Sequence, residues 1–262
     1  MRHVDDLGGT VDVPGRAERI VSLVPSLTEA VATTHRTSLV GATDWCTHPA
    51  DLEVTRVRGT KNPDWRAIVA LEPDLVLANK EENRELDVRR LREAGVQVWV
   101  TVIETVPQAL ASMDRLFTGA LGWPVPDWLA EARRLWSGPL PEVRATVAVP
   151  IWRDPWMVVG SSTYTGDLLR RAGLENVFTG HQDRYPAVEL AEIDRPDLDC
   201  VLLPDEPYVF NAHDGPEAFA HARTELVSGR LLTWYGPAMV EAATVLQAIP
   251  ATPVTGARSA GA

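Results

Sequence analysis

The chain has 262 residues, and 36 acidic side chains against 25 lysines and arginines give it a formal net charge of −11 at pH 7. That charge argues against binding to nucleic acid or to an anionic membrane surface. The length suffices for two sizeable cores or one large domain, and no apolar run approaches the length of a membrane span. The two cysteines, Cys46 and Cys200, form neither a disulfide framework nor a zinc-binding spacing.

The N-terminal residues are polar and contain no apolar segment of the kind that a secretion signal requires. We therefore expect the chain as written to be cytoplasmic, and extracytoplasmic if a leader has been removed from it. Residues 4–13 carry Gly8 and Gly9 between two β-prone pieces, a pattern that predicts a hairpin.

The first parallel strand is predicted at residues 19–24, and a helix follows it from residue 27 to about residue 34. Ser26 and Glu29 have the spacing of a capping box, in which each side chain bonds to the other's backbone N–H. A second short strand at residues 39–42 leads into a polar loop, residues 43–49. Cys46 lies in that loop, and a buried, inert thiol is a more common role for such a cysteine than metal ligation.

The stretch 65–83 combines an amphipathic run, a Pro73-Asp74 break, an apolar run at 75–78 and a polar segment, 79–83. A short run that is apolar at every position is typical of a buried parallel strand. The same pattern returns around Pro196-Asp197, with an apolar run at 201–203 and a polar turn after it. Two such units predict two similar α/β lobes. Ligands bind beyond the carboxyl ends of strands in open α/β sheets, so segments 79–83 and 204–210 are the first candidates.

Between the repeats, a helix predicted at residues 127–136 is flanked by prolines, which favours a stiff connector over a flexible tether. The predicted domains are an N-terminal lobe at 1–121, a linker helix at 122–140, a C-terminal lobe at 141–251 and a disordered tail at 252–262. In the second lobe we expect a strand at 145–150, a helix at 161–172, a last strand around residues 231–235 and a terminal helix at 237–248. The predicted fold class is thus α/β, with two parallel sheets and a ligand cleft between the lobes.

Several segments in this order resemble a known family. Residues 19–29 (RIVSLVPSLTE), Val40-Gly41 with the loop to Pro49, residues 68–76 (IVALEPDLV), residues 160–178 and Tyr185-Pro186 are similar to class III substrate-binding proteins. These are the receptors for vitamin B12, haem and ferric siderophores. The resemblance implies two α/β lobes joined by one rigid helix, and ligand binding without catalysis.

The resemblance also implies positions for ligand contacts. In the vitamin B12 receptor, aromatic side chains line the cleft at positions that correspond here to Trp45, Trp156 and Tyr185. Two further aromatic positions fall near Thr60 and Asn79, which are polar in this chain. Haem receptors usually supply a tyrosine or histidine to the iron, and the candidates for that role are His48, His181, Tyr164 and Tyr208.

From the residues and the resemblance together, the function is predicted to be the non-catalytic binding of cobalamin, a ferric siderophore or haem. The protein would be the substrate-binding component of an ABC transporter or a cytoplasmic relative of one. We expect no intrinsic cofactor, no metal site, a small-molecule ligand and a monomer. The candidate ligand-binding residues lie mainly in loops after predicted strands: Trp45, His48, Thr60, Lys61, Asn79, Lys80, Trp152, Trp156, Tyr185, Glu206 and Tyr208.

Two alternatives stay open at this point. A cytoplasmic enzyme or ligand sensor could use the same two-lobe scaffold, although the sequence contains no nucleotide-binding lysine motif, Gly-x-Ser-x-Gly or His-Glu-x-x-His. A permease partner is also open. Exported relatives commonly dock through one surface glutamate per lobe, and those positions correspond here to Arg66 and to Ala191, which is followed by Glu192.

Overall fold

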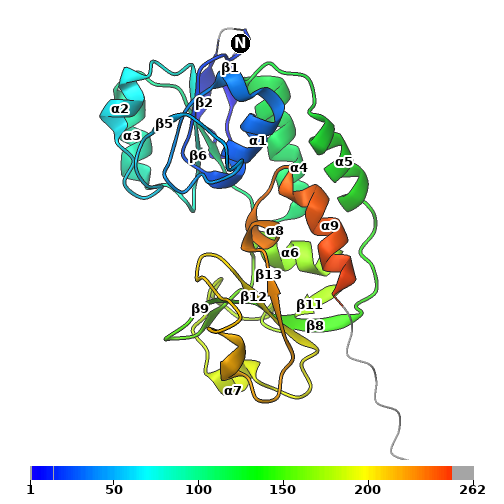
Figure 1. Ribbon diagram of the computed structural model, residues 1–262. Helices are drawn as coiled ribbons and strands as arrows, with labels where there is room; N and C mark the ends of the chain where they lie inside the picture. The colour runs from blue at the N-terminus through cyan, green and yellow to red at the C-terminus, as the bar shows by residue number, and fades with distance from the viewer. Residues whose placement is uncertain (1, 14, 250–262) are drawn as a thin grey trace, which may run out of the picture. The chain divides into compact units, whose positions relative to one another are not determined.

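The computed structural model of the chain describes residues 2–13 and 15–249 (Figure 1). The tail predicted at 252–262 lies outside these described residues. Contacts within the chain divide it into two units. Unit 1 comprises the chain up to Gly138 together with Thr233–Ala243, and unit 2 comprises Pro139–Leu232 together with the chain from Thr244 onward.

Unit 1 is built on a five-stranded parallel sheet in the order β5-β4-β3-β6-β7. Its central strands are apolar on both faces because helices cover both sides of the sheet. The strands are β3 (Ile20–Ser22), β4 (Leu39–Ala42), β5 (Thr55–Arg56), β6 (Leu75–Asn79) and β7 (Val98–Thr101). The helices are α1 (Pro25–His35), η1 (Arg36–Ser38), α2 (Trp65–Ala70), α3 (Glu85–Glu93), α4 (Val106–Asp114), η2 (Arg115–Ala120) and α5 (Asp127–Trp136).

One face of this sheet packs against α2 and α3. Alternate residues of neighbouring strands, such as Val76, Ala78 and Val98, form a buried cluster with Ile68 of α2 and Leu91 of α3. The start of α2 is defined by Asp64, whose carboxylate accepts the backbone N–H of Ala67 at 3.2 Å. In Figure 1 these two helices lie on one side of the sheet, and α1 and α4 lie on the other.

The capping box predicted at Ser26 and Glu29 is wrong. Helix α1 begins at Pro25, one residue before the predicted cap, and its N-cap residue Val24 makes no side-chain cap. The proline sets the backbone dihedral that a first helical position needs and has no N–H to satisfy. Ser26 is therefore already inside the first turn.

Helix α5 occupies the residues predicted for it, Asp127–Trp136. Arg133 of this helix pairs with Asp114 at 3.0 Å, and two of its aromatic side chains form hydrogen bonds within unit 1. The indole of Trp128 donates to Thr34 Oγ1 at 2.9 Å, and that of Trp136 donates to the carbonyl of Met239 at 2.8 Å. The N-terminal hairpin of β1 (Arg2–Val4) and β2 (Thr10–Asp12) also forms as predicted.

Unit 2 is built on a four-stranded parallel sheet in the order β11-β8-β12-β13. A short antiparallel pair, β9 with β10, follows β8. The strands are β8 (Ala145–Ala148), β9 (Pro150–Trp152), β10 (Met157–Val158), β11 (Leu174–Asn176), β12 (Cys200–Pro204) and β13 (Thr224–Val227). Its helices are α6 (Tyr164–Arg171), α7 (Leu190–Ile193), η3 (Pro216–Ala218) and α8 (Gly229–Thr233). Helix α9 (Ala238–Ala248) is divided between the units, with its residues up to Ala243 in unit 1.

The last strand of unit 2 was predicted at residues 231–235, and that prediction is wrong. Leu231 and Leu232 are buried in helix α8, whereas the edge strand is β13, Thr224–Val227. Strand β13 has no fully buried residue and carries a charged Glu225, so its sequence lacks the apolar run by which the central strands were found. Among the described residues, no helix has the length and apolar composition to cross a membrane.

Candidate functional site

Each sheet has one place where its strand order reverses. In unit 1 the chain runs from β3 to β4 and β5 on one side, then returns to place β6 and β7 on the other. In unit 2 the corresponding neighbours are β8 and β12. Open parallel sheets bind ligands beyond the carboxyl ends of the strands that flank such a reversal. The segments to examine are therefore those that follow β3, β6, β8 and β12.

The segment after β6 is held by a network of amide hydrogen bonds. Asn79 Oδ1 accepts the backbone N–H groups of Glu81 and Glu82, and its Nδ2 donates to Thr101. The Asn83 side chain accepts the N–H of Asn79 at 2.9 Å. With an exposed fraction of 5%, Asn79 gives a ligand almost no surface. The polar side chain predicted to contact ligand here instead shapes the loop that would present its neighbours.

The basic side chains of this region are at its surface. Lys80 is exposed, and its backbone N–H donates to the carbonyl of Thr101 at 3.0 Å. Lys61 is also exposed, and its ammonium donates to the carbonyl of Glu81. Thr60 is half-buried, and its carbonyl accepts from Asn83 Nδ2 at 3.0 Å. Burial raises the pKa of the Glu82 carboxyl, an effect that Lys61 partly opposes.

The loop after β4 presents Trp45 and buries Cys46. The guanidinium of Arg56 donates to the carbonyls of Thr43 and Cys46, both at 2.9 Å, and so holds the turn from below. Trp45 has an exposed fraction of 67% at the tip of this braced turn. His48 is exposed and lies edge to face with Trp234, with ring centroids 5.4 Å apart.

The Cys46 thiol lies between two hydroxyl groups, those of Thr28 at 3.0 Å and Thr43 at 3.1 Å. Burial raises its pKa, so the thiolate that a metal ligand or nucleophile needs is disfavoured. Among the described residues, no group of three or more histidine, cysteine, aspartate or glutamate side chains is arranged to hold a metal ion.

In unit 2, the segments after β8 and β12 meet at an aromatic pair. Trp152 lies edge to face with Tyr208, with ring centroids 5.6 Å apart, and keeps an exposed fraction of 45%. The Tyr208 hydroxyl donates to Asp214 Oδ2 at 2.7 Å, and that hydrogen bond raises the pKa of the phenol. Arg153 forms ion pairs with Asp214 and Glu217. This charged network thus fixes the position of the Tyr208 ring, against which Trp152 packs.

Asp214 and Glu217 were not identified from the sequence. They lie about sixty residues beyond Arg153 in a stretch without a recognisable motif, and only the fold brings the three together. Trp152 and Trp156, the predicted ligand residues on either side of Arg153, mark only one end of the network in the sequence.

Trp156 lies in the core of unit 2. Its indole stacks parallel to Phe210 at a centroid distance of 5.9 Å and contacts Phe219 edge to face at 5.5 Å. It belongs to a buried cluster with Ile193 and Val201, and its exposed fraction is 9%. This packing accounts for the side chain without a ligand.

The other candidates in unit 2 differ in exposure. Tyr185 has an exposed fraction of 40%, and the Arg184 guanidinium lies 6.0 Å from its ring centroid. Glu206 is half-buried beside Gly229, where a side chain would collide with it. Tyr164 is buried at the start of α6, whereas His181 is exposed and its Nδ1 accepts the N–H of Asp183 at 3.0 Å.

The two positions that correspond to docking glutamates lie on helices. Arg66 is exposed on α2, with its guanidinium carbon 4.5 Å from the ring centroid of Trp65. Ala191 lies in α7, where Glu189 and Glu192 form a reciprocal capping box.

Comparison with known proteins gives one consistent group of matches. No protein family model matches the chain. The vitamin B12-binding protein of Salmonella typhi is 26% identical over 190 residues, which is 68% of each chain. The periplasmic vitamin B12-binding protein BtuF of Vibrio cholerae superposes with a TM-score of 0.70 at 18% identity, over 90% of this chain and 97% of that one. A periplasmic haem-binding protein of Pseudomonas aeruginosa does so with a TM-score of 0.71 at 23% identity, over 88% and 92%.

The two solved structures establish a shared fold, and the curated relative adds a sequence match over two thirds of its length. All three are named as binding proteins rather than enzymes, which agrees with the function class predicted from the sequence. The co-linear motifs, the two parallel sheets and these matches agree with the resemblance to class III substrate-binding proteins, and the solved structures show that the chain shares their fold.

Proposed function

We propose that this protein binds a metal-containing macrocycle or metal chelate, with a corrinoid such as cobalamin as the first candidate, and serves as a substrate-binding component of an ABC transporter. The observation that carries the proposal is the distribution of its nine tryptophans. Six are buried and Trp65 is half-buried, whereas Trp45 and Trp152 are exposed. Both exposed rings lie in segments that follow parallel strands.

Exposed aromatic faces of this kind suit a broad, flat ligand. An indole or phenol ring covers a large apolar area and loses little conformational entropy on binding. The braced turn under Trp45 and the Arg153 network behind Trp152 and Tyr208 hold the rings in position before ligand arrives. Tyr185 adds a third exposed ring. We propose Trp45 in unit 1 and Trp152, Tyr185 and Tyr208 in unit 2 as the principal ligand contacts. The proposed polar contacts are His48, Lys61 and Lys80 in unit 1 and Glu206 in unit 2.

A corrinoid comes before haem because the two tyrosine candidates for an iron ligand are poorly suited to that role, which would leave it to the exposed His48 or His181. An iron-bound tyrosine must give up its proton, yet the Tyr208 hydroxyl donates to Asp214 and its pKa is raised. Tyr164 is buried at the start of a helix. A ligand whose metal already has its donors, such as cobalamin or a siderophore complex, needs no such side chain.

Native mass spectrometry of freshly purified protein, followed by titration with cyanocobalamin and with haemin, tests the proposal. A mass increment equal to a corrinoid or chelate, or saturable binding of one equivalent, is the expected result. A co-purified small molecule that the protein converts to a product, with no binding of either macrocycle, would overturn the proposal and support an enzyme on the same scaffold.

The compartment and the permease are tested separately. The solved relatives are named as periplasmic proteins, so the periplasm and the cytoplasm are the two compartments to distinguish. Fractionation of cells that produce the full-length protein from its own gene distinguishes the two. If the protein docks on a permease, the first position carries the positive Arg66 and the second carries the uncharged Ala191, next to Glu192, so we propose a permease surface that differs in charge from those of exported relatives.

A further inference from the structure

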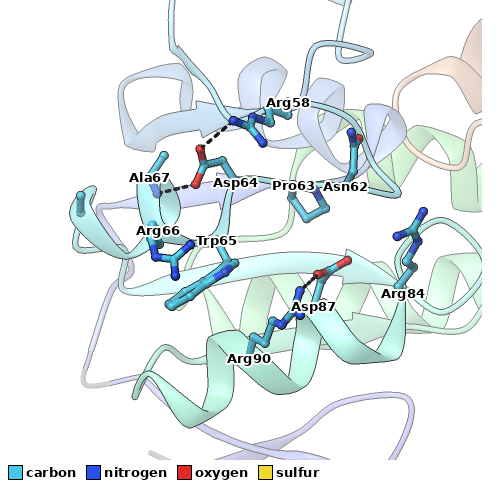
Figure 2. A pocket seen from close by; sticks show the side chains of 11 residues that line it. Arg58, Asn62, Pro63, Asp64, Trp65, Arg66, Ala67, Arg84, Asp87 and Arg90 are labelled. Atoms are coloured by element: carbon cyan, nitrogen blue, oxygen red, sulfur yellow. Dashed lines mark hydrogen bonds and ion pairs between the residues drawn. The ribbon is translucent and has the colours of Figure 1, made fainter.

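Unit 1 has a recessed surface that is lined by residues other than the predicted ligand residues, although its lining residue Asn62 directly follows Lys61 in the chain. A pocket of about 640 Å³ lies between α2 and α3 of unit 1 (Figure 2). Its volume is within the range of small-molecule sites. None of the eleven candidate ligand-binding residues lines it. Of the lining residues, only Arg66 has been given a role in binding above, at the proposed permease-docking position.

The pocket is positively charged in a negatively charged protein. Four arginines and two aspartates supply its charged lining, while the whole chain carries a formal charge of −11. Both aspartates are already engaged. Asp87 lies 3.2 Å from Arg90, and Asp64 caps α2 and lies 3.7 Å from Arg58. The two remaining arginines carry the uncompensated charge.

Those two arginines are Arg66, on α2, and Arg84, which directly precedes α3. Both are exposed, and neither forms an ion pair with any residue in 2–13 or 15–249. Figure 2 shows them at opposite ends of the pocket. Arg66 rests on the ring of Trp65, 4.5 Å from its centroid, which orients the guanidinium and leaves its N–H donors free at the edges.

We propose that this pocket binds a small organic anion with two separated phosphate groups, one on Arg66 and one on Arg84. A guanidinium binds a phosphate through two parallel N–H donors, and such charge-assisted bonds are among the strongest in proteins. Phosphate groups at the two ends of one molecule engage both arginines, whereas a monophosphate engages one. The site is independent of the macrocycle-binding role, and its ligand belongs to a different chemical class.

Isothermal titration at low ionic strength tests this, with fructose 1,6-bisphosphate and fructose 6-phosphate as the matched probes and sodium sulfate as a control anion. We expect the bisphosphate to bind at least about tenfold more tightly than the monophosphate, and Arg66→Gln or Arg84→Gln to abolish that difference. Arg89→Gln is the control variant, because Arg89 is an exposed arginine of α3 that does not line the pocket.

Three results would overturn the proposal. The first is no binding of either sugar phosphate at millimolar concentration. The second is equal affinity for the bisphosphate, the monophosphate and sulfate, which would indicate general anion screening. The third is an equal loss of affinity in the Arg89→Gln variant. Thermal melting of each variant shows whether it is folded before it is titrated.

Discussion

The side-chain oxygen of Asn83 accepts the backbone N–H of Asn79 at 2.9 Å, while the Asn83 N–H donates to the Asn79 carbonyl at 3.0 Å. The two residues close the turn that follows β6 from both ends. The Asn83 amide also donates to the carbonyls of Leu23 and Thr60. One buried side chain thereby ties together the segments after β3, β5 and β6, which the ligand proposal depends on.

Replacing Asn83 by Ala should lower the free energy of unfolding by roughly 1–3 kcal/mol, because buried carbonyl and N–H groups lose their partners. Urea denaturation followed by circular dichroism measures the change. Asn83→Asp keeps the acceptor for Asn79 but loses both donors, so it should also destabilise the fold. A variant Asn83→Ala as stable as wild type would mean that water replaces these bonds without loss.

Trp45→Ala should weaken ligand binding by roughly 2 kcal/mol or more if the ring is a central contact, with little change in melting temperature because the side chain is exposed. Fluorescence titration with cyanocobalamin and thermal melting on the same sample measure both effects. Trp152→Ala should behave in the same way. Unchanged affinity in both variants would remove the exposed aromatic rings from the site.

Trp156→Ala should have the opposite effects to Trp45→Ala, with a large loss of stability and little direct effect on affinity. Its indole fills a place between Phe210 and Phe219 in the unit 2 core, so truncation leaves a cavity. We expect a loss of about 3–5 kcal/mol in the free energy of unfolding. Affinity should fall only as far as the folded fraction falls. A Trp156→Ala protein that melts normally but binds no ligand would restore the ligand role that the sequence suggested for this residue.

Neither thiol should react with a disulfide reagent in the native protein. Both cysteines are buried; burial raises the pKa of Cys46, and it raises that of Cys200 to about 11. Ellman's reagent at neutral pH should therefore detect no thiol until denaturant is added, and two afterwards. Rapid modification of one thiol in the folded state would show that the Cys46 loop opens.

Glu82 should make stability depend on pH. Its pKa is raised by burial, so the native state holds a proton that the unfolded chain releases. Stability then falls as pH rises from the unfolded pKa, about 4.3, through the higher folded value, and the loss persists above it. Glu82→Gln should raise the melting temperature at neutral pH more than at about pH 4. Glu81→Gln, at an exposed neighbour, is the control, and an equal effect of both would contradict a special role for Glu82.

The parts of the fold that could be predicted are those whose residues face an apolar environment on both sides. Strands β6 and β12 are five-residue runs with every side chain buried, and both follow a Pro-Asp pair. Helix α5 was predicted by a different signal, the prolines that flank it. By contrast, β5 and β13 are edge strands with exposed, polar residues, so nothing in their composition distinguishes them from loops.

The site was harder to predict because exposure depends on partners that are distant in sequence. Trp152 and Trp156 are four residues apart in the same loop region, yet one is 45% exposed and the other 9%. The difference arises from Phe210 and Phe219, more than fifty residues away. In the same way, Asn79 is a polar residue at the end of a strand, where a ligand contact is expected. Its amide nevertheless donates to Thr101, and no local sequence pattern could indicate that hydrogen bond.

Unit 1 is not a continuous piece of chain. Its first 138 residues are completed by Thr233–Ala243, which supply the Met239 carbonyl that accepts from Trp136 and the Trp234 ring beside His48. A ribosome must therefore synthesise nearly the whole protein before the first unit can close. During that interval the α5 face that Met239 completes stays open to water. Unit 1 is thus completed only after most of unit 2 has been synthesised, and a fragment ending near residue 138 would lack part of the native unit.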